Sequence, residues 1–438
     1  MENFIPLNGR IAIVDDQIKQ ALPLMRVFAK NNIPYVYYKG DDVDYFPEQP
    51  ENDIRILLLD LNLLEGRDYL PKDIQSSLFN VIRHIISPNN FPYVIILWSR
   101  QENKYKGVLE KLFENDLKGC APIIILEWIK SEFFPNFSDE EENKDEEYKI
   151  LDELKKVITG LPAYSYLMQW ENCVHNSADK TIQEIFHDFH SQENWDNSAN
   201  CILDMFCKSY LGEHYNDSSI EDKAKSSLLF LNDVFCDTLE SNVLACDFSA
   251  ENELPYSVNE EYKSEIAARI NGCLFLSNQF DSSYQPGCVL PIELNENNTK
   301  YFHKLFHDCF VKNSLSTSEA KQLKKEIYKS LMPFEVIVTP DCDYAQKKAE
   351  YNRLVQGVII SVDFKDYVNS QSDAFYVSPI FEYNDNRCIM VLNYRYLVTT
   401  YKENHQCSSP LFRIRESILA EIRSKLARHI SRHGIMNL

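Results

Sequence analysis

Glycine and long apolar runs are both scarce in this chain. Only 11 of the 438 residues are glycine, which argues against a glycine-rich nucleotide-binding fold. No stretch approaches the roughly 18 consecutive apolar residues of a membrane-spanning helix, so we expect no membrane contact. The opening residues, MENFIPLNGRIAIVDD, lack a basic start followed by an apolar core, and we therefore expect no signal peptide.

Paired cysteines and positive charge are also lacking. None of the 12 cysteines forms a CxxC pair. Without a secretion signal, we expect reduced thiols and a cytoplasmic location. Acidic residues outnumber basic ones by 66 to 45, giving a net charge of −21. Such a charge repels nucleic acid over most of the surface, although it leaves room for a local basic patch.

Apolar residues make up 44% of the chain, enough for sizeable cores, and its length predicts roughly two to four domains. We predict a multidomain protein with three parts: an α/β domain over 1–135, a helical connector over 146–250 and an α+β domain over 260–438. The acidic segment 134–147 separates the first two parts.

The first part alternates β-rich runs with helix-like segments, which predicts an α/β sheet. Several of the runs are continuously apolar, as in parallel strands that are covered on both faces. The predicted strands are 10–14, 34–38, 54–59, 93–98 and 122–126, and the predicted helices are 17–31, 70–87 and 102–118.

The spacing of apolar residues changes in the later segments. Between 146 and 250, apolar residues recur at three- and four-residue spacing, which predicts roughly four to six helices. From about 260 onward, strand-like runs predict a strongly bent sheet or small barrel, which ends in an amphipathic helix over 415–430. The strand-like runs are 266–277, 286–294, 334–342, 355–364, 375–383 and 387–401.

Acidic residues gather where the predicted N-terminal strands end. Asp15 and Asp16 end the first strand, Asp60 the third and Ser99 the fourth, while Lys130 follows the fifth. In an open parallel sheet these ends share one edge, where function concentrates. Converging carboxylates repel one another unless a cation lies among them, and Mg²⁺ prefers such oxygen ligands. A carboxylate beside that ion can accept a phosphoryl group.

This order of residues resembles the receiver domain of bacterial two-component signalling, over about 30% of the chain. The resemblance implies a flavodoxin-like five-stranded parallel sheet with Asp60 as the phosphoacceptor and a histidine kinase as the phosphoryl donor. It makes Ser99 the switch hydroxyl and Lys130 the phosphate-pairing lysine. It also implies Mg²⁺ ligands from Asp15, Asp16, Asp60 and the carbonyl of Asn62.

Two departures from the family pattern stand out. The family's lysine directly follows the fifth strand and usually precedes a proline. Here Lys130 comes four residues after Leu126, where the predicted strand ends, and no proline follows it. A silent receiver, which folds but takes up no phosphate and serves an interaction scaffold, is therefore an alternative. Fusion of a divergent receiver to unusual domains also resembles proteins of bacterial anti-phage defence operons.

A second motif follows the predicted strand at 334–342. Asp341 and Asp343 suit helix capping around a buried Cys342. Alternatively, Asp341 with Asp363 and Lys365 matches a receiver-gated, metal-dependent nuclease, in which two acids hold a metal and a lysine helps to activate water. A third interpretation makes Cys342 a nucleophile or metal ligand.

The C-terminal helix is basic in an otherwise acidic protein. It could contact nucleic-acid phosphates, or it could dock against the acidic segment 139–147, a protein partner or a second copy of the chain. An apolar stripe beside the charges predicts that part of the helix is packed. The basic residues are Arg413, Arg415, Arg423, Lys425, Arg428 and Arg432.

Overall fold

The computed structural model of the chain divides into two compact units. The first comprises Met1–Asn200 and Phe230–Pro255, and the second Cys201–Leu229 and Tyr256–Leu438. The predicted division into 1–135, 146–250 and 260–438 remains a prediction. The described residues are 5–6, 10–60, 71–99, 106–134, 144–187, 195–246, 260–278, 280, 285–294, 304–305, 322, 325–328, 330–340, 350–368, 372–401 and 409–431.

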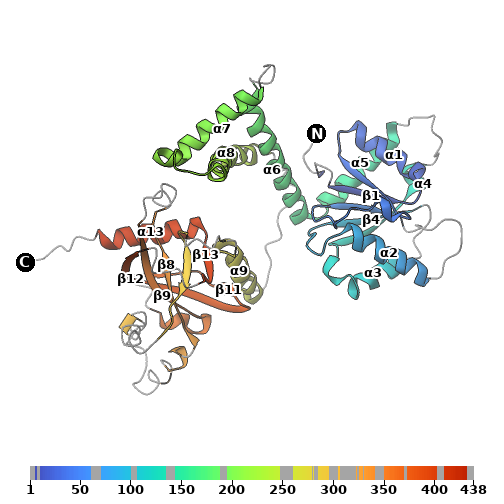
Figure 1. The fold of residues 1–438 in the computed structure, drawn as a ribbon. Coiled ribbons are helices and arrows are strands. Elements are labelled where there is room, and N and C mark those ends of the chain that lie inside the picture. The colour runs from blue at the N-terminus through green and yellow to red at the C-terminus, as the bar shows by residue number, and fades with distance from the viewer. Residues whose placement is uncertain are drawn as a thin grey trace, which may run out of the picture. The chain divides into compact units, whose positions relative to one another are not determined.

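A five-stranded parallel sheet forms the centre of the first unit (Figure 1). Its order is β2-β1-β3-β4-β5, and each of the five predicted strands is confirmed. Strands β1, β3 and β4 are buried along their whole length, as their continuous apolar runs predict. The bounds are β1 (Ile11–Asp15), β2 (Tyr35–Lys39), β3 (Ile56–Leu59), β4 (Val94–Ser99) and β5 (Ile124–Ile129).

Alternate residues of these strands pack against helices on opposite faces of the sheet. One layer contains α2 (Pro71–Ile85) and α3 (Lys106–Glu114), and the other contains α1 (Ile18–Lys30) and the short α4 (Lys130–Phe133) (Figure 1). Between β2 and β3, a stretch that is described throughout, the only helical element is the 3-10 turn Val43–Tyr45.

Two helices that the sequence assigned to the connector contribute to the core of this sheet. Ile150, Leu154 and Ile158 of α5 (Lys144–Thr159) are fully buried on the face that α1 also covers. Tyr164 and Met168 of α6 (Pro162–Phe186) join the same cluster. The chain continues in α7 (Trp195–Leu211) and α8 (Ile220–Ala245).

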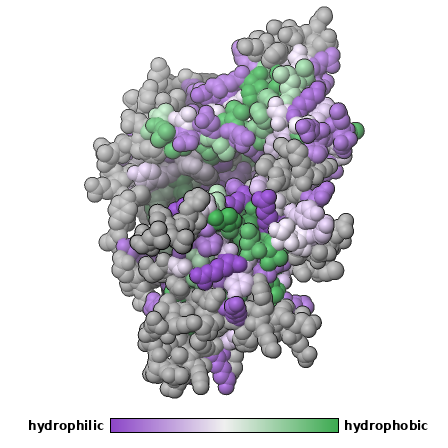
Figure 2. Space-filling model, turned by 90° about the vertical axis from the view of Figure 1, so that its left-hand side faces the viewer, coloured by the Kyte–Doolittle hydropathy of each residue, from purple (hydrophilic) through white to green (hydrophobic). Residues whose placement is uncertain are grey.

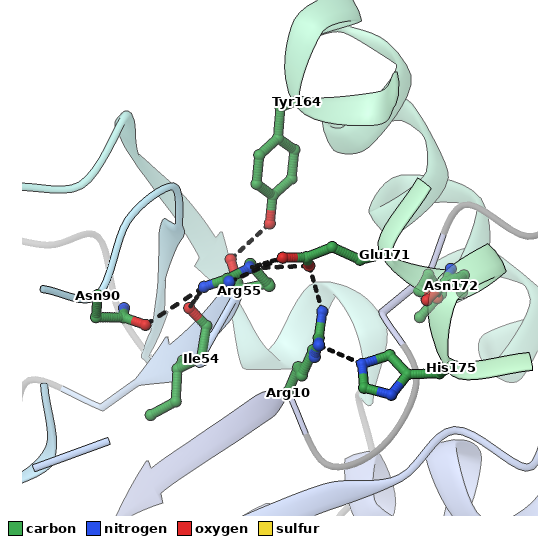
Figure 3. Close-up of polar contacts among 9 residues, drawn as sticks. Arg10, Ile54, Arg55, Asn90, Tyr164, Glu171, Asn172 and His175 are labelled. Carbon is green, nitrogen blue, oxygen red and sulfur yellow. Dashed lines mark hydrogen bonds and ion pairs between the residues drawn. The ribbon is translucent and has the colours of Figure 1, made fainter. Parts of the chain in front are cut away.

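A partly buried ion-pair cluster fastens α6 to the amino-terminal edge of the sheet (Figure 3). Glu171 lies between Arg10, which precedes β1, and Arg55, which precedes β3, and its carboxylate is 2.9 Å from Nη2 of Arg55. The hydroxyl of Tyr164 donates to the carbonyl of Arg55 at 2.6 Å, and Arg10 also contacts His175. Since one carboxylate serves two guanidinium groups, losing it would leave both without their shared counter-charge.

An antiparallel sheet curled into a half-barrel forms the second unit, so the predicted α+β architecture with a bent sheet is confirmed. The order is β10-β12-β9-β8-β7-β13-β6, with β11 paired to β12. Helix α13 (Glu416–Ile430) buries Leu419, Ile422 and Leu426 against one face. The strands are β6 (Leu276–Ser277), β7 (Cys288–Pro291), β8 (Met332–Ile337), β9 (Tyr351–Ser361), β10 (Phe375–Val377), β11 (Phe381–Tyr383), β12 (Asn386–Tyr401) and β13 (Phe412–Ile414).

One strand prediction was wrong. The run 266–277 lies mostly in the helix α9 (Glu260–Phe275), and only Leu276–Ser277 form a strand. The apolar run at its end suggested a strand, but Ile266, Ile270 and Leu274 recur every four residues, as on one side of a helix. Their side chains are between 37% and 57% exposed.

Apolar side chains at the surface form separate groups among polar ones on the face drawn in Figure 2. Several lie on α7 and α8, including Met205 at 60% and Leu228 at 60% exposure. Within the described part of the chain, no helix combines the length and apolarity needed to cross a bilayer. Binding of a protein partner or of a second copy of the chain therefore remains a prediction.

Replacing Glu171 by glutamine is expected to lower the free energy of unfolding of the first unit by about 3–5 kcal/mol, because two partly buried arginines lose their counter-charge. Urea unfolding followed by tryptophan fluorescence measures it, since all four tryptophans (Trp98, Trp128, Trp170 and Trp195) lie in this unit.

The matched control is Glu184→Gln on the same helix. Glu184 is 57% exposed and pairs with Lys180 at 3.7 Å, so its loss should change stability by about 0.5 kcal/mol or less. Equal effects of the two substitutions would contradict the anchoring role of Glu171.

Candidate functional site

Five polar residues that the sequence singled out lie at the carboxyl ends of four adjacent strands. Asp15 ends β1, with Asp16 next to it, and Asp60 directly follows β3. Ser99 ends β4 and is 3% exposed, and Lys130 directly follows β5. Because β1, β3, β4 and β5 are neighbours in the sheet, these residues share one edge, opposite to the edge that holds Arg10 and Arg55.

Lys130 is the centre of this arrangement. Its side chain is fully buried, and its Nζ atom lies 2.6 Å from Oδ2 of Asp15 and 2.6 Å from Oδ2 of Asp60. It also donates to Oε1 of Gln20 at 3.1 Å. A buried ammonium group requires charged and hydrogen-bonding partners, and here three acceptors supply them.

The sequence placed the end of the fifth strand too early. Strand β5 continues to Ile129, because Glu127, Trp128 and Ile129 pair with the last residues of β4. Trp128 is 8% exposed and packs beside Trp98 and Phe133. Lys130 therefore directly follows the strand, so its distance from the strand agrees with the receiver pattern, whereas the missing proline remains a departure.

The β1 carboxylate is held by further contacts. The backbone N–H of Gln17 donates to Oδ1 of Asp15 at 2.9 Å, while Lys130 occupies Oδ2. The hydroxyl of Tyr37, on the neighbouring strand β2, donates to the backbone carbonyl of Asp15 at 2.8 Å. Both carboxylate oxygens of Asp15 thus have fixed donors, so its orientation is defined before any ligand binds.

Asp15, Asp16 and Asp60 form a buried acidic triad. Each offers a carboxylate oxygen within 4.8 Å of the others. Burial, together with the charges of Asp60 and Asp15, raises the pKa of Asp16 to about 6. Burial also raises the pKa of Asp15, against the opposing effect of Lys130. Three carboxylates and one ammonium leave two negative charges in excess when all are ionised.

This donor set fits a hard divalent cation such as Mg²⁺. The excess of two negative charges equals the charge of the ion, and the ligand atoms are all oxygens. Oxygens bound to one Mg²⁺ lie at most roughly 4.2 Å apart, close to the spacing of up to 4.8 Å among these oxygens. Within the described residues, no other group of three such side chains converges in this way.

A cleft of about 470 Å³ adjoins the triad. Asp16 forms part of its wall, together with the start of α1 and the end of β2. Ligands of open parallel sheets bind outside the carboxyl ends of the strands, and the cleft gives the triad such an opening. The lining residues are Asp16, Gln17, Ile18, Lys19, Tyr37, Lys39 and Tyr45.

Gln20 is a site residue that the sequence reasoning missed. It is 7% exposed and lies on the buried side of α1 with Ala21 and Leu24. A glutamine among apolar neighbours on a helix face that points at the sheet is a signal that sequence analysis could have used.

The described residues do not support the nuclease hypothesis. Asp341, like Asn62 and Cys342, lies outside the described residues. Asp363 and Lys365 lie in the 3-10 turn Val362–Tyr367, where both are exposed, and the Ser361 hydroxyl donates to Asp363.

Several cations of the C-terminal helix region are engaged within their own unit. Arg423 donates to the carbonyls of Val338 and Thr339, at 3.2 and 2.6 Å. Lys425 pairs with Glu421 at 3.0 Å, and Arg415 donates to carbonyls of residues 273 and 276. Contact of this helix with nucleic acid remains a prediction.

No protein-family model matches the chain, and no curated protein matches it in sequence. The geometry of the acidic edge is therefore the basis for any functional conclusion.

Replacing Asp16 by asparagine is expected to weaken Mg²⁺ binding by about an order of magnitude or more, because one of three candidate ligands loses its charge. In metal-free protein the same change should raise the free energy of unfolding by about 1–3 kcal/mol, since it removes a buried charge beside two others. Calorimetric titration with Mg²⁺ and urea unfolding measure the two effects.

The control for this experiment is Asp44→Asn, at an exposed aspartate on the described segment after β2. It should change neither quantity. If Asp16→Asn left the Mg²⁺ affinity unchanged, the triad would not be the cation site.

The stabilising effect of Mg²⁺ is expected to depend on pH. The pKa of Asp16 is raised from 3.8 to about 6, so the folded protein binds this proton more tightly than the unfolded chain. Without metal, the contribution of Asp16 to stability therefore increases as the pH falls through about 6. With Mg²⁺ the pH dependence reverses, because the ion requires the ionised carboxylate. Stabilisation by Mg²⁺ therefore decreases as the pH falls.

Melting of the first unit, followed by tryptophan fluorescence with and without Mg²⁺, measures this effect. The rise in Tm on adding Mg²⁺ should be large at about pH 7.5 and small at about pH 5. A rise of equal size at both pH values would contradict a site built on Asp16.

Proposed function

We propose that the first unit is a receiver-like switch that accepts a phosphoryl group on Asp60. The observation that carries this proposal is the convergence of Asp60 with Asp15, Asp16 and the buried Lys130 at one sheet edge. The strand order β2-β1-β3-β4-β5 supports it, since this is the order of flavodoxin-like sheets.

In the proposed reaction a carboxylate oxygen of Asp60 attacks the phosphorus of a phosphohistidine on a histidine kinase. A P–O bond forms on Asp60 while the P–N bond breaks, and the electron pair returns to the imidazole. Asp15, Asp16 and Asp60 would hold Mg²⁺, which neutralises charge on the transferred group. Because the carboxylate of Asp15 is held in place, the nucleophile Asp60 has a neighbour of defined position during the attack.

Lys130 and Ser99 recognise the product. The ammonium group of Lys130, already 2.6 Å from Asp60, pairs with the new phosphoryl oxygens. Ser99 lies at the end of the strand next to β3, from which its hydroxyl donates to the phosphate. The added charge of about −1.5 to −2 rearranges the region around Ser99, and this change alters contact with the helices or with a partner.

The C-terminal domain, with its half-barrel, is the response module of this proposal. It delivers or blocks the response of a cytoplasmic bacterial signalling protein. A fusion of this kind is similar to proteins of anti-phage defence operons, and we extend the proposal to that setting.

Phosphate uptake from acetyl phosphate with Mg²⁺ tests the proposal, with the intact mass of the full chain as the readout. The wild type should gain one phosphoryl group, and Asp60→Asn should gain none. The matched control, Asp73→Asn at an exposed acid in the first turn of α2, should react like the wild type.

Two outcomes would overturn the proposal. A wild type that binds Mg²⁺ but takes up no phosphate would be a silent receiver. A variant Asp60→Asn that is phosphorylated like the wild type would place the acceptor elsewhere.

A further inference from the structure

We propose that Cys173 and Cys246 form a reversible disulfide that joins helix α6 to the carboxyl end of helix α8. Cys173 lies in the middle of α6, and Cys246 directly follows Ala245, the last residue of α8. Both residues belong to the first unit. The proposal is independent of phosphoryl transfer at Asp60.

The two thiols are already in contact. Their Sγ atoms lie 3.0 Å apart, and a disulfide of about 2.04 Å requires them to approach by roughly 1 Å. Cys246 directly follows the last residue of α8, so we expect its side chain to make this approach.

A second contact keeps the two helices aligned. The side chain of Asn242 donates to the hydroxyl of Ser177 at 2.7 Å. Ser177 lies four residues after Cys173 on α6, and Asn242 lies four residues before Cys246. The two contacts are therefore one helical turn apart on antiparallel segments, which holds the sulfur atoms opposite each other.

The two cysteines differ in exposure, and the difference assigns their roles. Cys173 is 2% exposed, whereas Cys246 is half-buried. Burial, together with the neighbouring Cys246, raises the pKa of Cys173 to about 12. Cys246 is thus the thiol that a soluble oxidant reaches first, and Cys173 is the thiol that resolves the product.

With hydrogen peroxide as the oxidant, the disulfide forms in two steps. The sulfur of Cys246 attacks one peroxide oxygen, the O–O bond breaks, and a sulfenic acid and one water form. The sulfur of Cys173 then attacks the sulfenic sulfur, the S–O bond breaks and a second water leaves. In total, two thiols lose two electrons and two protons to one peroxide, and a dithiol reductant reverses the change.

The bond would fix a segment that the sheet already holds at one end. Glu171, two residues before Cys173, is anchored by Arg10 and Arg55. Oxidation would therefore fasten the end of α8 to a helix that is anchored to the sheet, and it would close a loop that contains all of α7. Reduction would release the end of α8, after which the chain leads to α9.

Peptide mapping of the full chain tests the proposal. Cleavage after lysine and arginine gives a peptide 157–180, whose single cysteine is Cys173, and a peptide 226–263, which contains Cys236 and Cys246. In the variant Cys236→Ser the second peptide keeps only Cys246. After treatment with hydrogen peroxide, the two peptides of this variant should appear joined, with a loss of two hydrogen atoms, and dithiothreitol should separate them.

The control carries Cys246→Ser in addition to Cys236→Ser, and it should show no joined pair. Tryptophan fluorescence during urea unfolding verifies that both variants are folded. The oxidised Cys236→Ser protein should also melt several degrees higher than its reduced form, with no such rise in the double variant. Peptides that remain separate in folded, peroxide-treated Cys236→Ser protein would overturn the proposal.

Discussion

The contact on which the acidic edge depends is the one between Lys130 and the carboxylates of Asp15 and Asp60. Three buried acids at the ends of neighbouring strands would repel one another strongly, and a single ammonium group 2.6 Å from two of them makes the arrangement tolerable. The compensation is incomplete, because two negative charges remain, and burial keeps the pKa of Asp16 raised. The site is therefore stable enough to fold and charged enough to attract a divalent cation.

The opposite edge of the same sheet has a structural role. There, Glu171 joins the long helix α6 to Arg10 and Arg55, so that helix belongs to the sheet's own packing. Because α6 also carries Cys173 and Ser177, the contact with α8 is built on an anchored element. One unit thus combines a charged edge suited to phosphoryl chemistry with a thiol pair suited to oxidation.

Much of the first unit followed from its sequence, because continuously apolar strands and their acidic ends are local signals. The errors arose where tertiary packing decides. The predicted fifth strand ended at Leu126, but Trp128 packs beside Trp98 within β5, and the strand continues to Ile129. Gln20 was missed because its partner lies 110 residues away. The end of α9 was mistaken for a strand, since a short apolar run does not distinguish the two structures. The metal ligands and the roles in catalysis remain predictions.

A crystal structure of the protein with Mg²⁺ and beryllofluoride, a mimic of the phosphoryl group, tests the proposed site most directly. We predict the mimic on a carboxylate oxygen of Asp60, Mg²⁺ among Asp15, Asp16 and Asp60, and the ammonium group of Lys130 turned toward a fluorine. Beryllofluoride absent from Asp60 in crystals that contain the ion, or an ion bound away from the triad, would contradict the central claim.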